Sequence, residues 1–239
     1  MKRVLLLAAL IITGSLTCYV QAQFRKTVYG NEKVVTEERK AGSFDEIKVS
    51  SGIDIFLRQG NKEEIRVETD ENLQEYILTE ISGNVLNVYT EVNIRDAKQK
   101  KVYVTMKDVK SVKASSAGDV IGESPIKTDE IAIDASSAGD IKLEVYASRI
   151  YVTVSSSGDV SLNGEAGNLE ADLSSAGDLK ASELTVKDAD VSVSSAGDAN
   201  IFVTENLKAR ASSAGDIHYG GNPKNVDAHS SSAGGVHKR

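Results

Sequence analysis

Residues 136–140 read Ser-Ser-Ala-Gly-Asp, and this pentapeptide returns through the second half of the chain. One copy has Ser157 in place of alanine, and the last copy ends in Gly235 instead of aspartate. The glycines that mark the copies stand at steps of 21, 19, 19, 20, 18 and 19 residues. They are Gly118, Gly139, Gly158, Gly177, Gly197, Gly215 and Gly234. A constant period of about twenty residues is typical of a solenoid, in which a short unit repeats and stacks.

The flanks of each copy alternate between apolar and polar residues. Before Gly158 the apolar residues are Ile150, Val152 and Val154, and Val160 follows the turn. Alternation with a period of two predicts a strand with one buried face. Each repeat is therefore predicted to be a strand, a tight turn, a second strand and a looser turn, which absorbs the differences in repeat length.

One such unit cannot bury its apolar side alone, so the units are predicted to stack as parallel strands about 4.8 Å apart. Many inward positions are alanine, which brings the two sheets close together. The sequence thus predicts an all-β fold, a flattened parallel β-helix with about 19–20 residues per coil. We expect the turn glycines to adopt positive φ, where a Cβ is costly. The serine and aspartate side chains are expected to bond the turn amides.

The N-terminus has the features of a secretory signal peptide over residues 1–22. A basic head is followed by an apolar run over residues 4–16, which is too short to span a bilayer as a helix. Small residues precede a cleavage site after Ala22. The alternative is a lipoprotein signal that uses Cys18, the only cysteine. In both cases we expect export across the inner membrane to the periplasm, the outer membrane or the cell surface.

The remaining residues, 23–239, are predicted to form a single β-helix domain. Residues 111–239 form its regular half. Residues 23–110, where the repeat is faint, are predicted to form less regular coils that cap one end of the core. Within that first half, residues 72–78 are predicted to form a short helix with Asp70 as its N-cap.

The composition excludes several classes of partner. The formal charge of −7 becomes −9 when Lys2 and Arg3 leave with the signal peptide, because two positive charges are lost. This acidity argues against nucleic acid and against anionic membrane surfaces. Contact with a membrane is expected only if Cys18 carries a lipid. Aromatic residues make up 5% of the chain, which leaves little material for the walls of a sugar-cleaving cleft.

Part of the first half is similar to a known family. The similar stretches are residues 39–47 (Arg-Lys-Ala-Gly-Ser-Phe-Asp-Glu-Ile), 51–55 (Ser-Gly-Ile-Asp-Ile), 59–60 (Gln-Gly) and 68–72. Together with the later turns, they resemble the "head GIN" domain, domain of unknown function 2807, of exported Bacteroidetes proteins. The resemblance implies a right-handed, pectin-lyase-like β-helix at the cell envelope and a role in adhesion. It implies no catalytic residues.

Six aspartates that close the repeated turns are predicted to form a column along one edge. They are Asp119, Asp140, Asp159, Asp178, Asp198 and Asp216. Stacked carboxylates suit a ladder of calcium ions, since hard cations take carboxylate oxygens. In the alternative interpretation each aspartate caps its own turn and faces water. Neighbouring aspartates also approach the spacing of a retaining glycosidase pair, but stacking alone produces that spacing.

Three histidines lie near the C-terminus. His218 and His237 are predicted to stack outward on the last two coils, with His229 nearby on the other strand. Such a pair can ligate a metal, but this set of ligands is incomplete.

These features predict a non-enzymatic adhesion or surface-binding protein, with a surface glycan or a protein as its ligand. The alternatives are an envelope scaffold without a specific ligand and a polysaccharide-active enzyme. No cofactor is expected apart from the calcium considered above. The C-terminal coil is a predicted site of homo-oligomerisation, because an uncovered strand edge is a template for another strand.

Overall fold

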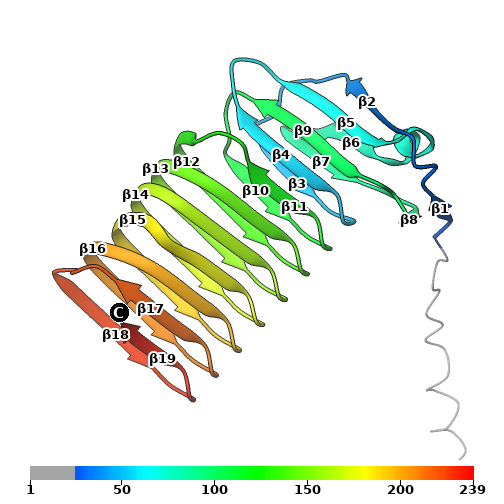
Figure 1. The fold of residues 1–239 in the computed structure, drawn as a ribbon. Coiled ribbons are helices and arrows are strands. Elements are labelled where there is room, and N and C mark those ends of the chain that lie inside the picture. Colours follow the sequence, from blue (N-terminus) through cyan, green and yellow to red (C-terminus); the bar gives the residue numbers. More distant parts are fainter. Residues whose placement is uncertain (1–24) are drawn as a thin grey trace, which may run out of the picture.

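The computed structural model describes residues 25–239, so the predicted signal peptide and Cys18 lie outside the described residues. Figure 1 shows an elongated body in which similar coils stack toward the C-terminus, and less regular strands lie at the opposite end. Among the described residues, every regular element is a strand except one 3₁₀ helix, η1. Within residues 25–239, no helix has the length and apolar character needed to cross a membrane.

The N-terminal half consists of short strands and η1. Its elements are β1 (Thr27–Tyr29), β2 (Val34–Arg39), β3 (Glu46–Val49), β4 (Asp54–Gln59), β5 (Glu64–Asp70), η1 (Glu71–Tyr76), β6 (Leu78–Ser82), β7 (Val85–Tyr89), β8 (Asn93–Arg95) and β9 (Lys100–Met106).

The C-terminal half consists of longer strands that repeat. Its elements are β10 (Ser111–Ala114), β11 (Asp119–Gly122), β12 (Ile126–Ala135), β13 (Asp140–Val154), β14 (Asp159–Leu173), β15 (Asp178–Val193), β16 (Asp198–Ala211), β17 (Asp216–Gly220), β18 (Asn225–Ser230) and β19 (Gly235–Lys238).

Neighbouring coils pair in parallel and in register, as the repeat predicts. Ile141 lies opposite Val160 on one face, and Val152 lies opposite Ala171 on the other. The predicted parallel β-helix is confirmed as a β-solenoid of about 7 turns over residues 111–238. The looser turns differ from the prediction, because β13, β14, β15 and β16 each run unbroken from one tight turn to the next. The chain still bends from one face to the other at the predicted looser turn, but the backbone there pairs with the next coil and therefore counts as part of the strand.

The N-terminal half continues the two faces and then closes them. Strands β3 and β4 pair in parallel with β10 and β11, and β7 and β9 pair in parallel with β3 and β4. Beyond them the direction reverses, because β6 lies antiparallel to β7, β5 to β9, and β2 to β5. The reversed strands cover the edges of β7 and β9 that would otherwise be open to another chain. In this arrangement the first half covers one end of the core.

The short helix differs from the prediction in extent and in capping. It is a 3₁₀ helix over Glu71–Tyr76, and Asp70 makes no side-chain bond to it. The buried Asp70 carboxylate instead accepts the amide of Glu32 at 2.5 Å and that of Lys98 at 2.8 Å. These amides come from distant parts of the chain, so a local capping pattern could not reveal them.

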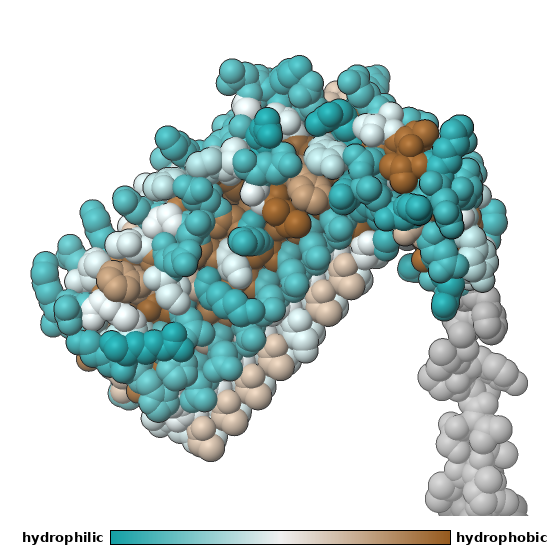
Figure 2. Space-filling model, in the orientation of Figure 1, coloured by the Kyte–Doolittle hydropathy of each residue, from teal (hydrophilic) through white to brown (hydrophobic). Residues whose placement is uncertain are grey.

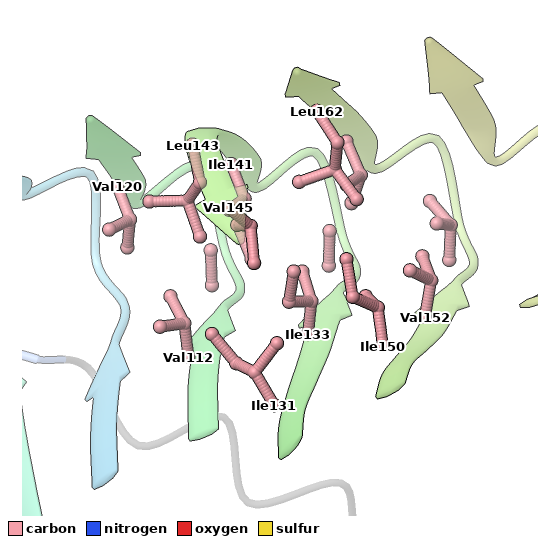
Figure 3. Close-up of a cluster of buried hydrophobic side chains, with 14 of the residues drawn as sticks. Val112, Val120, Ile131, Ile133, Ile141, Leu143, Val145, Ile150, Val152 and Leu162 are labelled. Carbon is pink, nitrogen blue, oxygen red and sulfur yellow. The ribbon is translucent and has the colours of Figure 1, made fainter. Parts of the chain in front are cut away.

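The core is a continuous double layer of inward side chains. In Figure 3, residues such as Ile131 and Ile133 from one face lie opposite Ile141 and Leu143 from the other. Ile131 is 0% exposed and Leu143 is 2% exposed. Burying an aliphatic side chain of this size contributes about 1.5–3 kcal/mol to stability. Burial of these inward side chains is therefore the main favourable contribution to folding.

Candidate functional site

The tight turns form one edge of the solenoid and share one geometry. In the turn that begins at Ser136, Ser137 has φ 51° and Ala138 has φ 57°. The Gly139 amide closes the turn by donating to the Ser136 carbonyl at 3.0 Å. Two consecutive left-handed residues closed in this way form a type I′ turn. The prediction that the glycines hold positive φ is wrong, because the left-handed residues are the two residues before each glycine, a serine followed by an alanine or, before Gly158, by Ser157.

The glycine has a different purpose, which is to let two coils approach each other. A Cβ on Gly139 would lie 2.7 Å from the carbonyl carbon of Ala114, in the preceding coil. A Cβ on Gly158 would lie 2.7 Å from the carbonyl carbon of Ala135. No side chain fits at this separation, so the position requires glycine for backbone-to-backbone packing.

Each turn is hydrogen-bonded to the next along the edge. The Ala117 amide donates to the Ser137 carbonyl at 3.1 Å, and the same bond recurs as far as Ala214 and Ser232. The side chains of these turn residues are exposed up to the last coils. In Figure 2 they form a regular row of pale and light-brown residues along the lower edge of the molecule. We name this row, with its bonded backbone, the turn edge.

The turn edge begins earlier than the sequence analysis indicated. Ser51 has φ 68° and Gly52 has φ 62°, and the Gly52 amide donates to the Ser116 carbonyl at 3.0 Å. Asp54 then lies opposite Asp119, so it extends the aspartate column. The signal was present in the sequence Ser-Ser-Gly-Ile-Asp at residues 50–54, which matches the pentapeptide at both serines and at the aspartate. Its glycine stands at the third position instead of the fourth.

The six predicted aspartates do form a column, because each lies opposite the next in the strand register. Burial, followed by the charges of Asp119 and Asp159, raises the pKa of Asp140 above its ordinary value. Burial likewise raises the pKa of Asp119, and burial together with flanking aspartates raises that of Asp178. Burial first, and the neighbouring carboxylates second, therefore disfavour the ionised form of Asp119, Asp140 and Asp178.

The carboxylates interact along the column rather than with their own turns. Oδ1 of Asp119 accepts the backbone amide of Asp140 at 3.3 Å, and Nζ of Lys180 lies 3.1 Å from Oδ2 of Asp159. The interpretation that each aspartate caps its own turn is therefore wrong for Asp119. Within residues 25–239, no group of three or more His, Cys, Asp or Glu side chains is placed to hold a metal ion. The calcium ladder stays a prediction.

The column lies on an open face. The side chains of Asp159 and Asp216 are 38% and 41% exposed. A hollow of about 250 Å³ lies beside the column and is lined by residues that include Lys142, Ser161 and Lys180, but none of the six aspartates lines it. The paired carboxylates thus lack the enclosed cleft that a glycosidase needs to exclude water.

The histidines lie where the sequence placed them. The rings of His218 and His237 stack with their centroids 5.2 Å apart. Nε2 of His237 lies 3.7 Å from Oδ1 of Asp216, beside Gly235, which replaces the last aspartate of the repeat. His229 lies on β18, where its Nε2 is 3.0 Å from Oδ1 of Asp227.

The register, the turn edge and the reversed N-terminal strands define a β-solenoid that is capped at one end. Residues 43–223 match the family described as "Putative auto-transporter adhesin, head GIN domain". The chain belongs to this family, as the resemblance at residues 39–72 indicated. Among curated proteins, none matches the sequence.

Several solved structures share the fold. A "putative adhesin" from Bacteroides fragilis superposes with a TM-score of 0.84 at 21% identity, over 89% of this chain and 100% of that one. A "putative adhesin" from Parabacteroides distasonis gives 0.74 at 23% identity, over 90% and 100%. A "putative lipid binding protein" from the same species gives 0.74 at 24% identity, over 90% and 100%. At these identities the likeness concerns the fold alone.

Proposed function

We propose that this chain is an exported protein of the cell envelope that binds a surface ligand without catalysing a reaction. The observation that carries the proposal is the turn edge, in which backbone bonds join successive turns from Gly52 to Ser232. This bonding holds an elongated body rigid, and rigidity lowers the entropic cost of contact with an extended ligand. Membership of a family described as an adhesin head supports the same function.

The electrostatics of the carboxylates support the non-enzymatic part of the proposal. A catalytic carboxylate pair divides into one raised and one lowered pKa inside a cleft. In this column the pKa values of Asp119, Asp140 and Asp178 all shift upward, and the column faces solvent. Burial, with a smaller contribution from the neighbouring carboxylates, explains such shifts without a reaction.

An envelope scaffold is the second candidate function. The observation in its favour is the last coil, where β18 and β19 each pair with one neighbour on one side only among the described residues. An open strand edge favours assembly over ligand binding. The location of the protein in the periplasm, in the outer membrane or at the cell surface is part of the proposal, as is lipidation at Cys18.

Two measurements test the proposal. Purified protein comprising residues 23–239 is applied to arrays of bacterial and host glycans and of envelope proteins, and saturable binding is expected. Intact cells that express the full chain are then treated with protease, and loss of the protein from these cells is expected if it reaches the outer face. Protection from protease and no binding on any array would favour the scaffold, and turnover of an acidic polysaccharide would favour the enzyme.

A further inference from the structure

The solenoid has one corner that departs from the tight turn, and it lies next to the start of the turn edge. In the stack, the coil on the N-terminal side of the first tight turn is formed by β7 and β9. The chain crosses from β7 to β9 through a longer corner, residues 90–99, which contains β8. Strand β8 pairs with β1 in a separate two-stranded sheet, seen at the right of Figure 1. A cleft of about 790 Å³ lies between this small sheet and the first tight turn. We name it the corner cleft.

The corner cleft carries positive charge on an acidic protein. Arg25 and Lys100 line it, and Lys48 lines an adjoining hollow of about 350 Å³ that shares Arg25 with the cleft. Among residues 25–239, no carboxylate lies within 4.0 Å of the charged nitrogens of these three side chains, although the formal charge of the chain is −7. Residues 1–24 contain no Asp or Glu that could supply a partner.

The Lys100 side chain lies against the first turn rather than extending into solvent. It is half-buried, and its Nζ lies so close to the first turn that a Cβ on Gly52 would be 2.9 Å from it. The neighbouring Lys101 is directed elsewhere, since its Nζ lies 5.7 Å from the centre of the Phe56 ring. The carboxylate that lines the adjoining hollow, Glu80, accepts the Tyr89 hydroxyl at 2.9 Å. An ammonium without a carboxylate partner can donate charge-assisted hydrogen bonds to an anionic ligand.

The cleft also contains a backbone acceptor that the repeat leaves unused. In every later turn, the carbonyl of the second serine accepts an amide from the preceding turn, as Ser116 does from Gly52. The first turn has no tight turn before it, and among the described residues no donor reaches the carbonyl of Ser51. The later serine carbonyls face the preceding coil, which at this end is the coil with the longer corner, and the lining of the corner cleft includes Ser51. A ligand hydroxyl would take the place of the missing amide.

The rest of the lining is rich in hydroxyl and amide groups. Ser50, Thr27 and Asn93 contribute polar atoms, and Ile94 contributes an apolar surface. The Asn93 amide group donates to the Thr27 hydroxyl at 3.4 Å, which leaves the Asn93 carbonyl oxygen available to a ligand. Polar groups spaced around a small apolar surface suit a ring that carries several hydroxyls.

We infer that the corner cleft binds an acidic saccharide residue, with its carboxylate at Arg25 and Lys100 and its hydroxyls at the Ser51 carbonyl and Asn93. The inference rests on the proposed surface-binding function and narrows it to one site and one class of ligand. The cations select the carboxylate, while the carbonyl and the amide select the hydroxyls, so neither a neutral sugar nor a simple anion satisfies the whole site.

The test uses the protein comprising residues 23–239 and three probes: tetragalacturonate, a glucuronate-terminated oligosaccharide and a sialate-terminated oligosaccharide. Each is titrated by calorimetry beside its methyl ester, which keeps the hydroxyls and removes the charge. We expect at least one acid to bind and its ester to bind at least tenfold more weakly. Binding is also expected to weaken as sodium chloride is raised, because the contact is ionic.

Variants assign the binding to the cleft. Lys100→Gln and, separately, the exposed Arg25→Gln are expected to weaken binding of the acid about tenfold or more. Lys187→Gln, which removes an equal charge from an exposed position on the distant β15, is expected to leave it unchanged. Thermal unfolding of each variant checks that the fold is retained.

Three results would overturn the inference. The first is that none of the three acids binds the unsubstituted protein. The second is that acid and ester bind equally well, and the third is that Lys100→Gln binds the acid as well as the unsubstituted protein does. If array ligands bind while Lys100→Gln has no effect, the corner cleft is the wrong site and the proposed surface-binding function stands.

Discussion

The amide of Ala138 donates to the carbonyl of Ser156 in the next coil at 3.1 Å, and both residues are left-handed, with φ of 57° and 51°. Neither residue is a glycine, so each adopts a conformation that costs about 1–2 kcal/mol. In this conformation the turn amide reaches the next coil. The hydrogen bonds between stacked coils therefore offset the cost of the left-handed residues in the tight turns, and the same bonds connect one coil to the next.

Replacing Ala138 with glycine is expected to stabilise the protein. Glycine adopts positive φ without the cost that alanine bears, and part of this gain is offset by the greater freedom of glycine in the unfolded chain. A net gain of about 0.5–1 kcal/mol is expected, which corresponds to a rise in melting temperature of about 1–4 °C for a domain of this size. Ala132→Gly in β12 is the control and should destabilise, because glycine weakens a strand. A lower melting temperature for Ala138→Gly would contradict the strain argument.

Replacing Gly139 with alanine is expected to destabilise the protein by about 1–3 kcal/mol or more, as overpacking does. The new Cβ would collide with the Ala114 backbone, which cannot move without separating two coils. Gly83→Ala is the matched control, because Gly83 has φ 64° but no atom within 4 Å of a built Cβ. Denaturant unfolding measures both. Gly83→Ala bears only the strain of a positive φ, so a loss for Gly139→Ala no greater than that for Gly83→Ala would contradict the collision with Ala114.

The aspartate column is expected to make the protein more stable as the pH falls from neutral toward about 4. Burial and flanking charges raise the pKa of Asp140 in the folded state above 3.8. Its charged form is therefore disfavoured by folding, and this penalty disappears as the pH falls through the raised pKa. Asp140→Asn should be more stable than the unsubstituted protein at pH 7, and the difference should shrink toward pH 4. Melting temperatures across this range measure it.

The control for the column is Asp172→Asn, which removes an exposed aspartate from the other face in β14. It should change the melting temperature little at any pH, as surface substitutions do. If the melting temperature of Asp140→Asn exceeds that of the unsubstituted protein by more at pH 4 than at pH 7, the argument that the folded state raises the pKa of Asp140 is contradicted.

Calcium is expected to leave the melting temperature unchanged relative to a chelator. A calcium ion takes six to eight oxygen ligands, whereas each coil offers one carboxylate, and Asp119 already accepts a backbone amide. Magnesium serves as the control for a general ionic effect. A rise of several degrees with calcium alone, absent in Asp159→Asn, would restore the calcium ladder.

The last coil is expected to associate with the last coil of a second copy. The edges of β7 and β9 at the opposite end are covered by antiparallel strands, so two C-terminal ends meet. Val226 is 45% exposed at the inward position of β18, opposite Leu207. Val226→Lys should give a monomer at concentrations where light scattering detects a dimer of the unsubstituted protein. Ile121→Lys, within the stack and 36% exposed, should still dimerise. A strictly monomeric unsubstituted protein would refute the contact.

The fold of the second half could be predicted from the sequence because the repeat can be recognised in short stretches of residues. Alternating residues such as Ile150, Val152 and Val154 define a buried face, and a fixed period obliges identical faces to stack. The aspartate column followed from the same period, since equal spacing places equal positions one above another. The cap over residues 23–110 was predicted in outline only, because its strands β2 and β5 pair with each other and with β9, at distant places in the chain.

Contacts between coils, rather than the pentapeptide itself, determine which turn residues hold positive φ and why the fourth residue is glycine. The sequence named glycine as the residue that allows the turn, but only the stacked backbones show that Gly139 faces Ala114 while Ser137 and Ala138 carry the positive φ. A turn type depends on dihedral angles that the neighbouring coil enforces, and that coil is about twenty residues away. The corner cleft could not be predicted from the sequence either. Its lining residues Arg25, Ser51 and Lys100 are far apart in the chain, and only the tertiary structure brings them together.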